Sequence, residues 1–88
     1  MKTRTIKNLT LVQATESRCD VFFTMNGETR LVGHYNRPLS FLSKDDEKAE
    51  KDLVMNYEFA PFCDYTEIIK RWQTGMTMEK YKTRRNIQ

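Results

Sequence analysis

The chain has 88 residues, a formal net charge of +3 at pH 7, 39% hydrophobic residues and 31% charged residues. A chain of this length has room for one hydrophobic core, so we expect residues 1–88 to form a single small domain. Its apolar runs are only two or three residues long, which excludes a membrane-spanning helix and a secretory signal and favours a cytoplasmic protein.

The first part of the chain predicts three antiparallel strands. Thr5–Val12 is predicted as the first strand, and the polar residues after it turn the chain back. Arg18–Met25 alternates between two faces, which is the period-two pattern of a strand. Asn26-Gly27 follows directly, and because both residues tolerate positive φ, they predict a type I′ hairpin that leads into Glu28–Tyr35.

A two-residue turn also predicts the register of this hairpin. On one face the expected pairs are Met25 with Glu28, Phe23 with Arg30, Val21 with Val32 and Cys19 with His34. On the other face Phe22 pairs with Leu31. That second face has little to cover it, so we expect it to meet a partner or a second copy of the chain through Phe22, Leu31 and Tyr35.

The middle of the chain allows two interpretations. Asp52–Phe59 alternates cleanly and is predicted as a fourth strand, preceded by a short solvated helical turn. The alternative is a helix that begins at Lys44 and is capped by Ser43, because Lys44–Asp52 is rich in helix-forming residues.

The last part of the chain predicts one helix and a basic segment. Asp64 is a candidate N-cap with Glu67 at the capping-box position, and Gly75 ends the helix predicted over Asp64–Thr74. Residues 76–88 either add a second short helix or stay mobile until a ligand binds. The expected fold is α+β: a four-stranded, mainly antiparallel sheet, formed by the meander with the Asn-Gly hairpin plus a later strand, packed by the C-terminal helix.

Charge is unevenly distributed: residues 1–7 carry +3, residues 8–69 carry −5 and residues 70–88 carry +5. Such a basic segment favours RNA, because cations neutralise phosphates and planar groups stack on unpaired bases. Duplex DNA is less favoured, since no helix-turn-helix or zinc-finger spacing is present. The alternative is a solvated tail. The predicted nucleic-acid contacts are Lys70, Arg71, Lys80, Tyr81, Lys82, Arg84 and Arg85.

Metal and catalytic chemistry have little support in the sequence. Cys19, Cys63 and His34 stand singly, without the close spacing of a zinc site, so we interpret both thiols as reduced and expect no metal or cofactor. A metal-independent ribonuclease is the enzymatic alternative, because His34 lies on the same predicted strand as Glu28, Arg30 and Tyr35. No nucleophile or nucleotide-binding motif accompanies them, so we expect no enzyme.

These observations favour a small non-enzymatic interaction protein. By analogy of size and the lack of a catalytic motif, we expect an inhibitor or adaptor of the kind that phages and other mobile elements encode. It would act on a host protein or ribonucleoprotein, with the basic C-terminal segment contacting RNA, and it could form a homodimer. The second alternative is a purely protein-binding module that contacts no nucleic acid.

Overall fold

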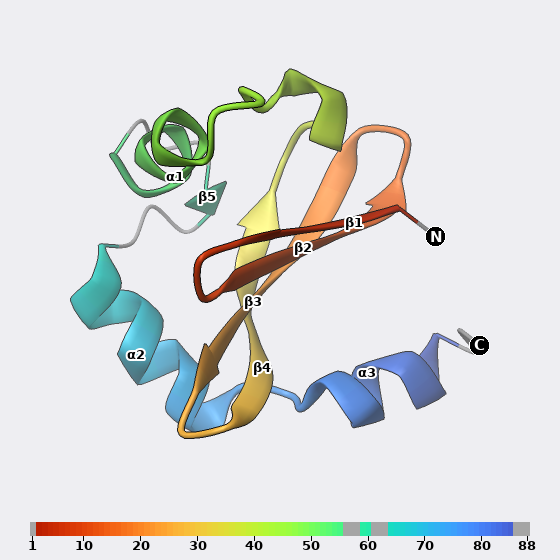
Figure 1. The fold of residues 1–88 in the computed structure, drawn as a ribbon. Helices are drawn as coiled ribbons and strands as arrows, with labels where there is room; N and C mark the ends of the chain where they lie inside the picture. The colour runs from red at the N-terminus through yellow and green to blue at the C-terminus, as the bar shows by residue number, and fades with distance from the viewer. Residues whose placement is uncertain (1, 56–58, 61–63, 86–88) are drawn as a thin grey trace.

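The computed structural model describes residues 2–55, 59–60 and 64–85, and Figure 1 shows their arrangement. One antiparallel sheet follows the sequence order β1 (Thr3–Ile6), β2 (Leu9–Thr15), β3 (Arg18–Met25), β4 (Glu28–Tyr35) and β5 (Phe59–Ala60). The helices are a short 3-10 turn η1 (Leu39–Phe41), α1 (Asp46–Met55), α2 (Tyr65–Thr74) and α3 (Met78–Arg84). The predicted α+β class, with an antiparallel meander, a later strand and C-terminal helices, is confirmed.

Helices cover both faces of the sheet (Figure 1). α1 and α2 pack on the face that carries the larger core, which consists of Ile6, Leu9, Leu11, Cys19, Val21, Phe23, Val32, Tyr35, Leu42, Ala49, Leu53, Ile68 and Trp72. α3 packs on the opposite face over a smaller cluster of Val12, Phe22 and Tyr81, bordered by Leu31, Met76 and Met78. Burying each large apolar side chain contributes about 1.5–3 kcal/mol, so both faces stabilise the fold.

The first predicted strand is in fact a hairpin. The structure divides Thr5–Val12 between β1 and β2, because the chain reverses at Lys7, which has a φ of 55°. Ile6 pairs with Leu9 across this turn, and both side chains are fully buried in the larger core. The turn lacks glycine, so the sequence pattern did not reveal it.

The Asn-Gly hairpin is confirmed, with φ of 53° at Asn26 and 75° at Gly27. The predicted pairs Met25–Glu28, Phe23–Arg30 and Phe22–Leu31 are also confirmed.

Beyond Phe22 the predicted register is wrong, because a β-bulge adds one residue to β4. Val21 faces Gly33 instead of Val32, and Cys19 faces Tyr35 instead of His34. The bulge therefore places His34 opposite Asp20, and it moves Tyr35 into the larger core.

The predicted strand Asp52–Phe59 is wrong over residues 52–55, which belong to α1, and the helical alternative holds there. The Asp45 carboxylate accepts a hydrogen bond from the Glu47 amide at 2.9 Å and so caps the start of α1. Ala49 and Leu53, four residues apart, are both fully buried, so a helical period explains the burial better than a strand period does.

α2 begins as predicted, with the Asp64 carboxylate accepting a hydrogen bond from the Glu67 amide at 3.0 Å. Gly75 ends the helix, but its φ of −75° is open to any residue. Glycine is needed there for space, because a Cβ atom would lie 2.1 Å from the Leu31 carbonyl oxygen of β4. Among the described residues, no helix has the length and apolar character of a bilayer crossing.

Candidate nucleic-acid interface

The basic segment of the chain forms α3, and α3 is docked on the sheet. Thr77 caps it by accepting a hydrogen bond from the Lys80 amide at 3.3 Å. The Tyr81 side chain is only 5% exposed, and its ring meets Phe22 edge-on, with 4.8 Å between the ring centroids. The basic side chains of α3 are therefore carried by a packed helix over residues 78–84.

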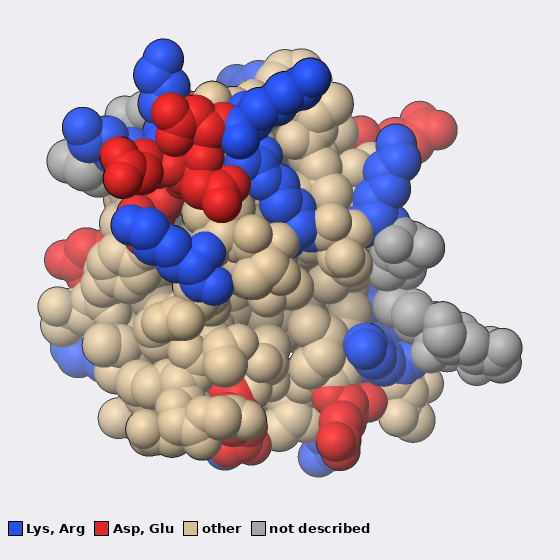
Figure 2. Space-filling view, viewed as in Figure 1, with Lys and Arg blue, Asp and Glu red and all other residues tan. Residues whose placement is uncertain are grey.

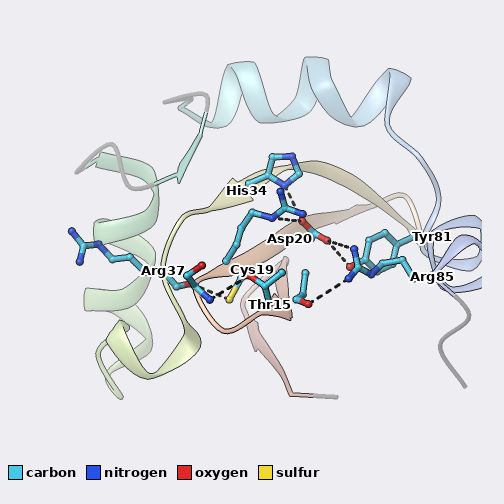
Figure 3. A network of polar contacts seen from close by, with 10 residues as sticks. Thr15, Cys19, Asp20, His34, Arg37, Tyr81 and Arg85 are labelled. Atoms are coloured by element: carbon cyan, nitrogen blue, oxygen red, sulfur yellow. Dashed lines mark hydrogen bonds and ion pairs between the residues drawn. The ribbon is translucent and has the colours of Figure 1, made fainter.

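The polar centre of this docking is the Asp20 carboxylate, which is buried beneath α3 (Figure 3). It accepts hydrogen bonds from the Tyr81 hydroxyl at 2.5 Å and from His34 Nδ1 at 2.9 Å. Two guanidinium groups lie within ion-pair distance, Arg18 Nε at 3.7 Å and Arg85 at 3.9 Å. A buried carboxylate without partners would cost several kcal/mol, so these four groups, called here the Asp20 hub, make its burial tolerable.

The Asp20 hub changes the pKa of Tyr81 and brings Arg85 close to the Tyr81 ring. Burial, the hydrogen bond to Asp20 and the carboxylate charge raise the pKa of Tyr81 well above its usual range, so the phenol stays a donor at neutral pH. Arg85 also lies over the Tyr81 ring, 5.6 Å from its centroid, and donates to the Ala14 carbonyl oxygen at 3.4 Å. The hub thus joins β2, β3, β4 and α3.

His34 is oriented by the hub but is partly open to solvent, with 43% of its side chain exposed. Because the carboxylate can only accept, Nδ1 carries the proton, and Nε2 has no other partner among the described residues. Nε2 is then an acceptor when the ring is neutral and a donor when it is protonated. His34 lines a groove of about 610 Å³ together with Arg71, Thr74, Gly75 and Met76, called here the His34 groove.

A second groove, of about 790 Å³, is called here the Lys80 groove. Its lining includes Lys80, Arg84 and Arg30, and it shares Thr74, Gly75 and Met76 with the His34 groove. Both grooves therefore border the linker between α2 and α3, residues 75–77. Among the described residues that line them, none is acidic.

The linker is held in place by β4. The Leu31 amide donates to the Met76 carbonyl oxygen at 2.7 Å, and the Arg30 guanidinium donates to the Gln73 carbonyl oxygen at 3.0 Å. Arg30 also lies 4.6 Å from the Trp72 ring centroid and pairs with Glu28 at 3.1 Å. Arg30 is thus committed to holding the end of α2. Lys80 and Arg84 present cations to the Lys80 groove, and Arg71 lines the His34 groove while it is also paired with Glu67 at 3.7 Å.

The structure separates the predicted nucleic-acid contacts into two groups. Arg71, Lys80 and Arg84 line the grooves, whereas Lys70 and Lys82 are exposed on α2 and α3 and are not among the lining residues. Tyr81 and Arg85 instead face the Asp20 hub. Because the Tyr81 ring is buried against Phe22, it is not placed to stack on a base in this structure.

The predicted partner surface of Phe22, Leu31 and Tyr35 is not open in the structure. Phe22 is fully buried because α3 covers it, and Tyr35 is 2% exposed because the bulge turns it into the larger core. Leu31 is half-buried and lines the His34 groove.

Sequence reasoning missed the pairing of Asp20 with His34. The signal was Gly33, since a glycine inside a strand often marks a bulge. The same bulge separates the residues of the ribonuclease alternative: Glu28 and Arg30 lie against α2, whereas His34 lies with Asp20 on the α3 side.

Cys19 is a buried free thiol whose Sγ donates to the Arg37 carbonyl oxygen at 3.4 Å. Burial and the neighbouring Asp20 charge raise the pKa of Cys19 to about 11. Cys63 lies outside the described residues, and the described part of the chain contains no group of three or more potential metal ligands.

No family model, curated protein or solved structure matches this chain significantly. Its function therefore has to be inferred from the surface itself.

Proposed function

We propose that this chain is a small non-enzymatic interaction protein that contacts single-stranded RNA through the His34 and Lys80 grooves and the exposed side of α3. The observation that carries the proposal is the lining of the two grooves. Arg71 lines the His34 groove, Lys80 and Arg84 line the Lys80 groove, and no acidic residue is among the described lining of either. A polyanion is the ligand that such a lining attracts, because each phosphate contact releases a bound counterion.

The way α3 packs on the sheet supports this proposal. The Asp20 hub and the Phe22 contact hold the helix against the sheet, so Lys80 and Arg84 project from a fixed backbone. A fixed backbone lowers the entropy lost on binding, which favours affinity over that of a disordered basic tail. Cations near the C-terminal end of α3 are also favoured by the helix dipole.

The surface over α1 makes a less suitable polyanion site. In Figure 2 the acidic side chains over α1 are surrounded by Lys and Arg side chains, so opposite charges alternate there. Two of these contacts are ion pairs of 2.9 Å, Arg4 with Asp46 and Lys7 with Glu50. A phosphate backbone lying over α1 would meet both signs of charge.

Acting on a host protein or ribonucleoprotein, the chain would work as an inhibitor or adaptor. When the RNA of a partner complex binds in the two grooves, the chain would cover that RNA strand and block other molecules from reaching it. The nucleic acid is the primary ligand in this proposal, and a protein partner would be reached through the RNA.

The test is RNA binding by charge variants with a matched control. Fluorescence anisotropy of a labelled 16-nucleotide oligouridylate at low salt is compared for wild type and the triple variant Lys80→Gln, Lys82→Gln, Arg84→Gln. The control is Lys7→Gln, Lys48→Gln, Lys51→Gln, which removes the same charge from α1 and from the turn that pairs with it, at residues that line none of the grooves. We expect the α3 variant to lose roughly tenfold or more in affinity and the control less than threefold, since specific phosphate contacts outweigh net charge. Equal losses, or no binding by wild type, would refute the proposal.

The same samples test the non-enzymatic part of the proposal. The labelled RNA should remain intact on a denaturing gel after long incubation at high protein concentration. Cleavage that disappears in His34→Gln, while the variant keeps its melting temperature, would show that the protein is a ribonuclease instead.

A further inference from the structure

We infer that Phe41 is a stacking platform for an unpaired RNA base, with a neighbouring basic groove for the phosphates of the same strand. This inference rests on the proposed function and adds a second contact to it. Phe41 is 62% exposed, the highest exposure among the large hydrophobic residues that the structure describes. The Arg37 guanidinium lies over its ring, 5.2 Å from the centroid.

The ring is displayed by an anchored turn. The Phe41 amide donates to the Pro38 carbonyl oxygen at 3.1 Å, and the Leu39 amide donates to Gln13 Oε1 at 3.3 Å. The next residue, Leu42, is buried in the larger core. Phe41 is therefore held outward on η1, which suits a rigid stacking surface.

A groove of about 390 Å³ begins beside the platform, and its lining includes Leu39 and Ser40 of η1. Lys2, Arg4 and Lys44 also line it, and none of its described lining residues is acidic. Arg4 is paired with Asp46, so Lys2 and Lys44 supply the cations for a ligand. We call this the Lys44 groove.

The exposed aromatic ring and the neighbouring cations together favour a nucleotide as the ligand. A nucleotide offers a flat base and an anionic phosphate a short distance apart, and the platform and the Lys44 groove provide an aromatic face and cations side by side. An acidic peptide would use the cations but has no flat group for Phe41. The ligand we commit to is single-stranded RNA.

The platform and the linker lie at different ends of the molecule (Figure 1), whose longest extent is 30 Å. A strand long enough to reach both surfaces gains from the second contact, because that contact forms at high effective concentration. A strand of four nucleotides can occupy only one of them.

The experiment measures how Phe41→Ala and Phe41→Tyr bind labelled oligouridylates of four and 16 nucleotides. Ile69→Ala, which truncates an exposed apolar residue on α2, is the matched control. Loss of one stacked base should weaken binding of the 16-mer about five- to 150-fold in Phe41→Ala. Phe41→Tyr and the control should remain within threefold of wild type.

The salt dependence distinguishes this inference from the proposed function. Phe41→Ala should leave the slope of log Kd against log salt unchanged, since stacking neutralises no charge, whereas the α3 triple variant should reduce it. Wild-type affinity in Phe41→Ala would overturn the platform while leaving the linker grooves intact. Absence of RNA binding by wild type would overturn both. If poly-glutamate displaces the 16-mer from wild type but not from Phe41→Ala, the platform is a site for acidic peptides and the inference is overturned.

Discussion

Removing the Tyr81 hydroxyl tests whether the Asp20 hub holds α3 on the sheet. Tyr81→Phe keeps the ring and its edge-on contact with Phe22, so the change is confined to one hydrogen bond. Asp20 would keep His34 Nδ1 at 2.9 Å, but the nearest other cation to the vacated oxygen would be Arg85 at 3.9 Å. The Asp20 side chain is 3% exposed, so water has little access to replace the lost donor.

The expected loss is that of a hydrogen bond to a buried charged group, about 1.5–3 kcal/mol in the free energy of unfolding. For a domain of this size, such a loss lowers the melting temperature by roughly 6–24 °C. Asp20→Ala should lower the free energy of unfolding by more than Tyr81→Phe does. The loss should stay below about 3–5 kcal/mol, which is the cost of breaking a fully buried ion pair. Its two arginine partners, Arg18 and Arg85, are 43% and 35% exposed and can turn to solvent.

The assay is urea unfolding followed by circular dichroism, and the matched control is Tyr65→Phe. Tyr65 donates to Glu50 near the surface, so its hydroxyl should contribute only about 0–1 kcal/mol. A Tyr81→Phe variant as stable as wild type, or no more destabilised than Tyr65→Phe, would show that the hub does not hold α3.

Three further predictions concern the linker, the buried thiol and acid stability. Gly75→Ala should unfold or strongly destabilise the protein, because its Cβ would lie 2.1 Å from the Leu31 oxygen; a melting temperature within 3 °C of wild type would refute this. In a Cys63→Ser background, iodoacetamide should modify Cys19 slowly at pH 8 and rapidly in denaturant, because the pKa of Cys19 is raised to about 11; equal rates would contradict its burial. Hydrogen bonds from Tyr65 and Lys7 lower the pKa of Glu50 in the folded protein. The ionised Glu50 carboxylate therefore stabilises the fold above its ordinary pKa of 4.5, and this stabilisation is lost as the pH falls through the lower folded pKa. Glu50→Gln should therefore flatten the stability curve below about pH 4.5, and a curve parallel to wild type would rule that out.

The sequence predicted the elements that short local motifs specify, such as tight turns and helix caps. Asn26-Gly27 specifies its own turn, and Asp64 satisfies the first amides of α2, so both features could be read directly. The helix over Asp46–Met55 was harder to predict, because alternation at its end imitates a strand and only tertiary burial of Ala49 and Leu53 decides between them.

The candidate interface was predictable by charge but not by geometry. The charge pattern identified Arg71, Lys80 and Arg84, which the fold brings to the linker grooves. It could not reveal that Tyr81 turns inward, because that depends on a buried carboxylate 61 residues away in the sequence. The pairing of that carboxylate with His34 depends in turn on a one-residue bulge, which a periodic pattern does not encode.

The measurement that most directly tests the central claim is the salt dependence of RNA binding. For a single strand the slope of log binding constant against log salt is about −0.7 per neutralised phosphate. With Lys80, Lys82 and Arg84 each contacting one phosphate, the wild-type slope should be about −2 or steeper, and the triple variant should lose about two units of it. A wild-type slope near zero, or a slope unchanged in the triple variant, would contradict an RNA interface on α3.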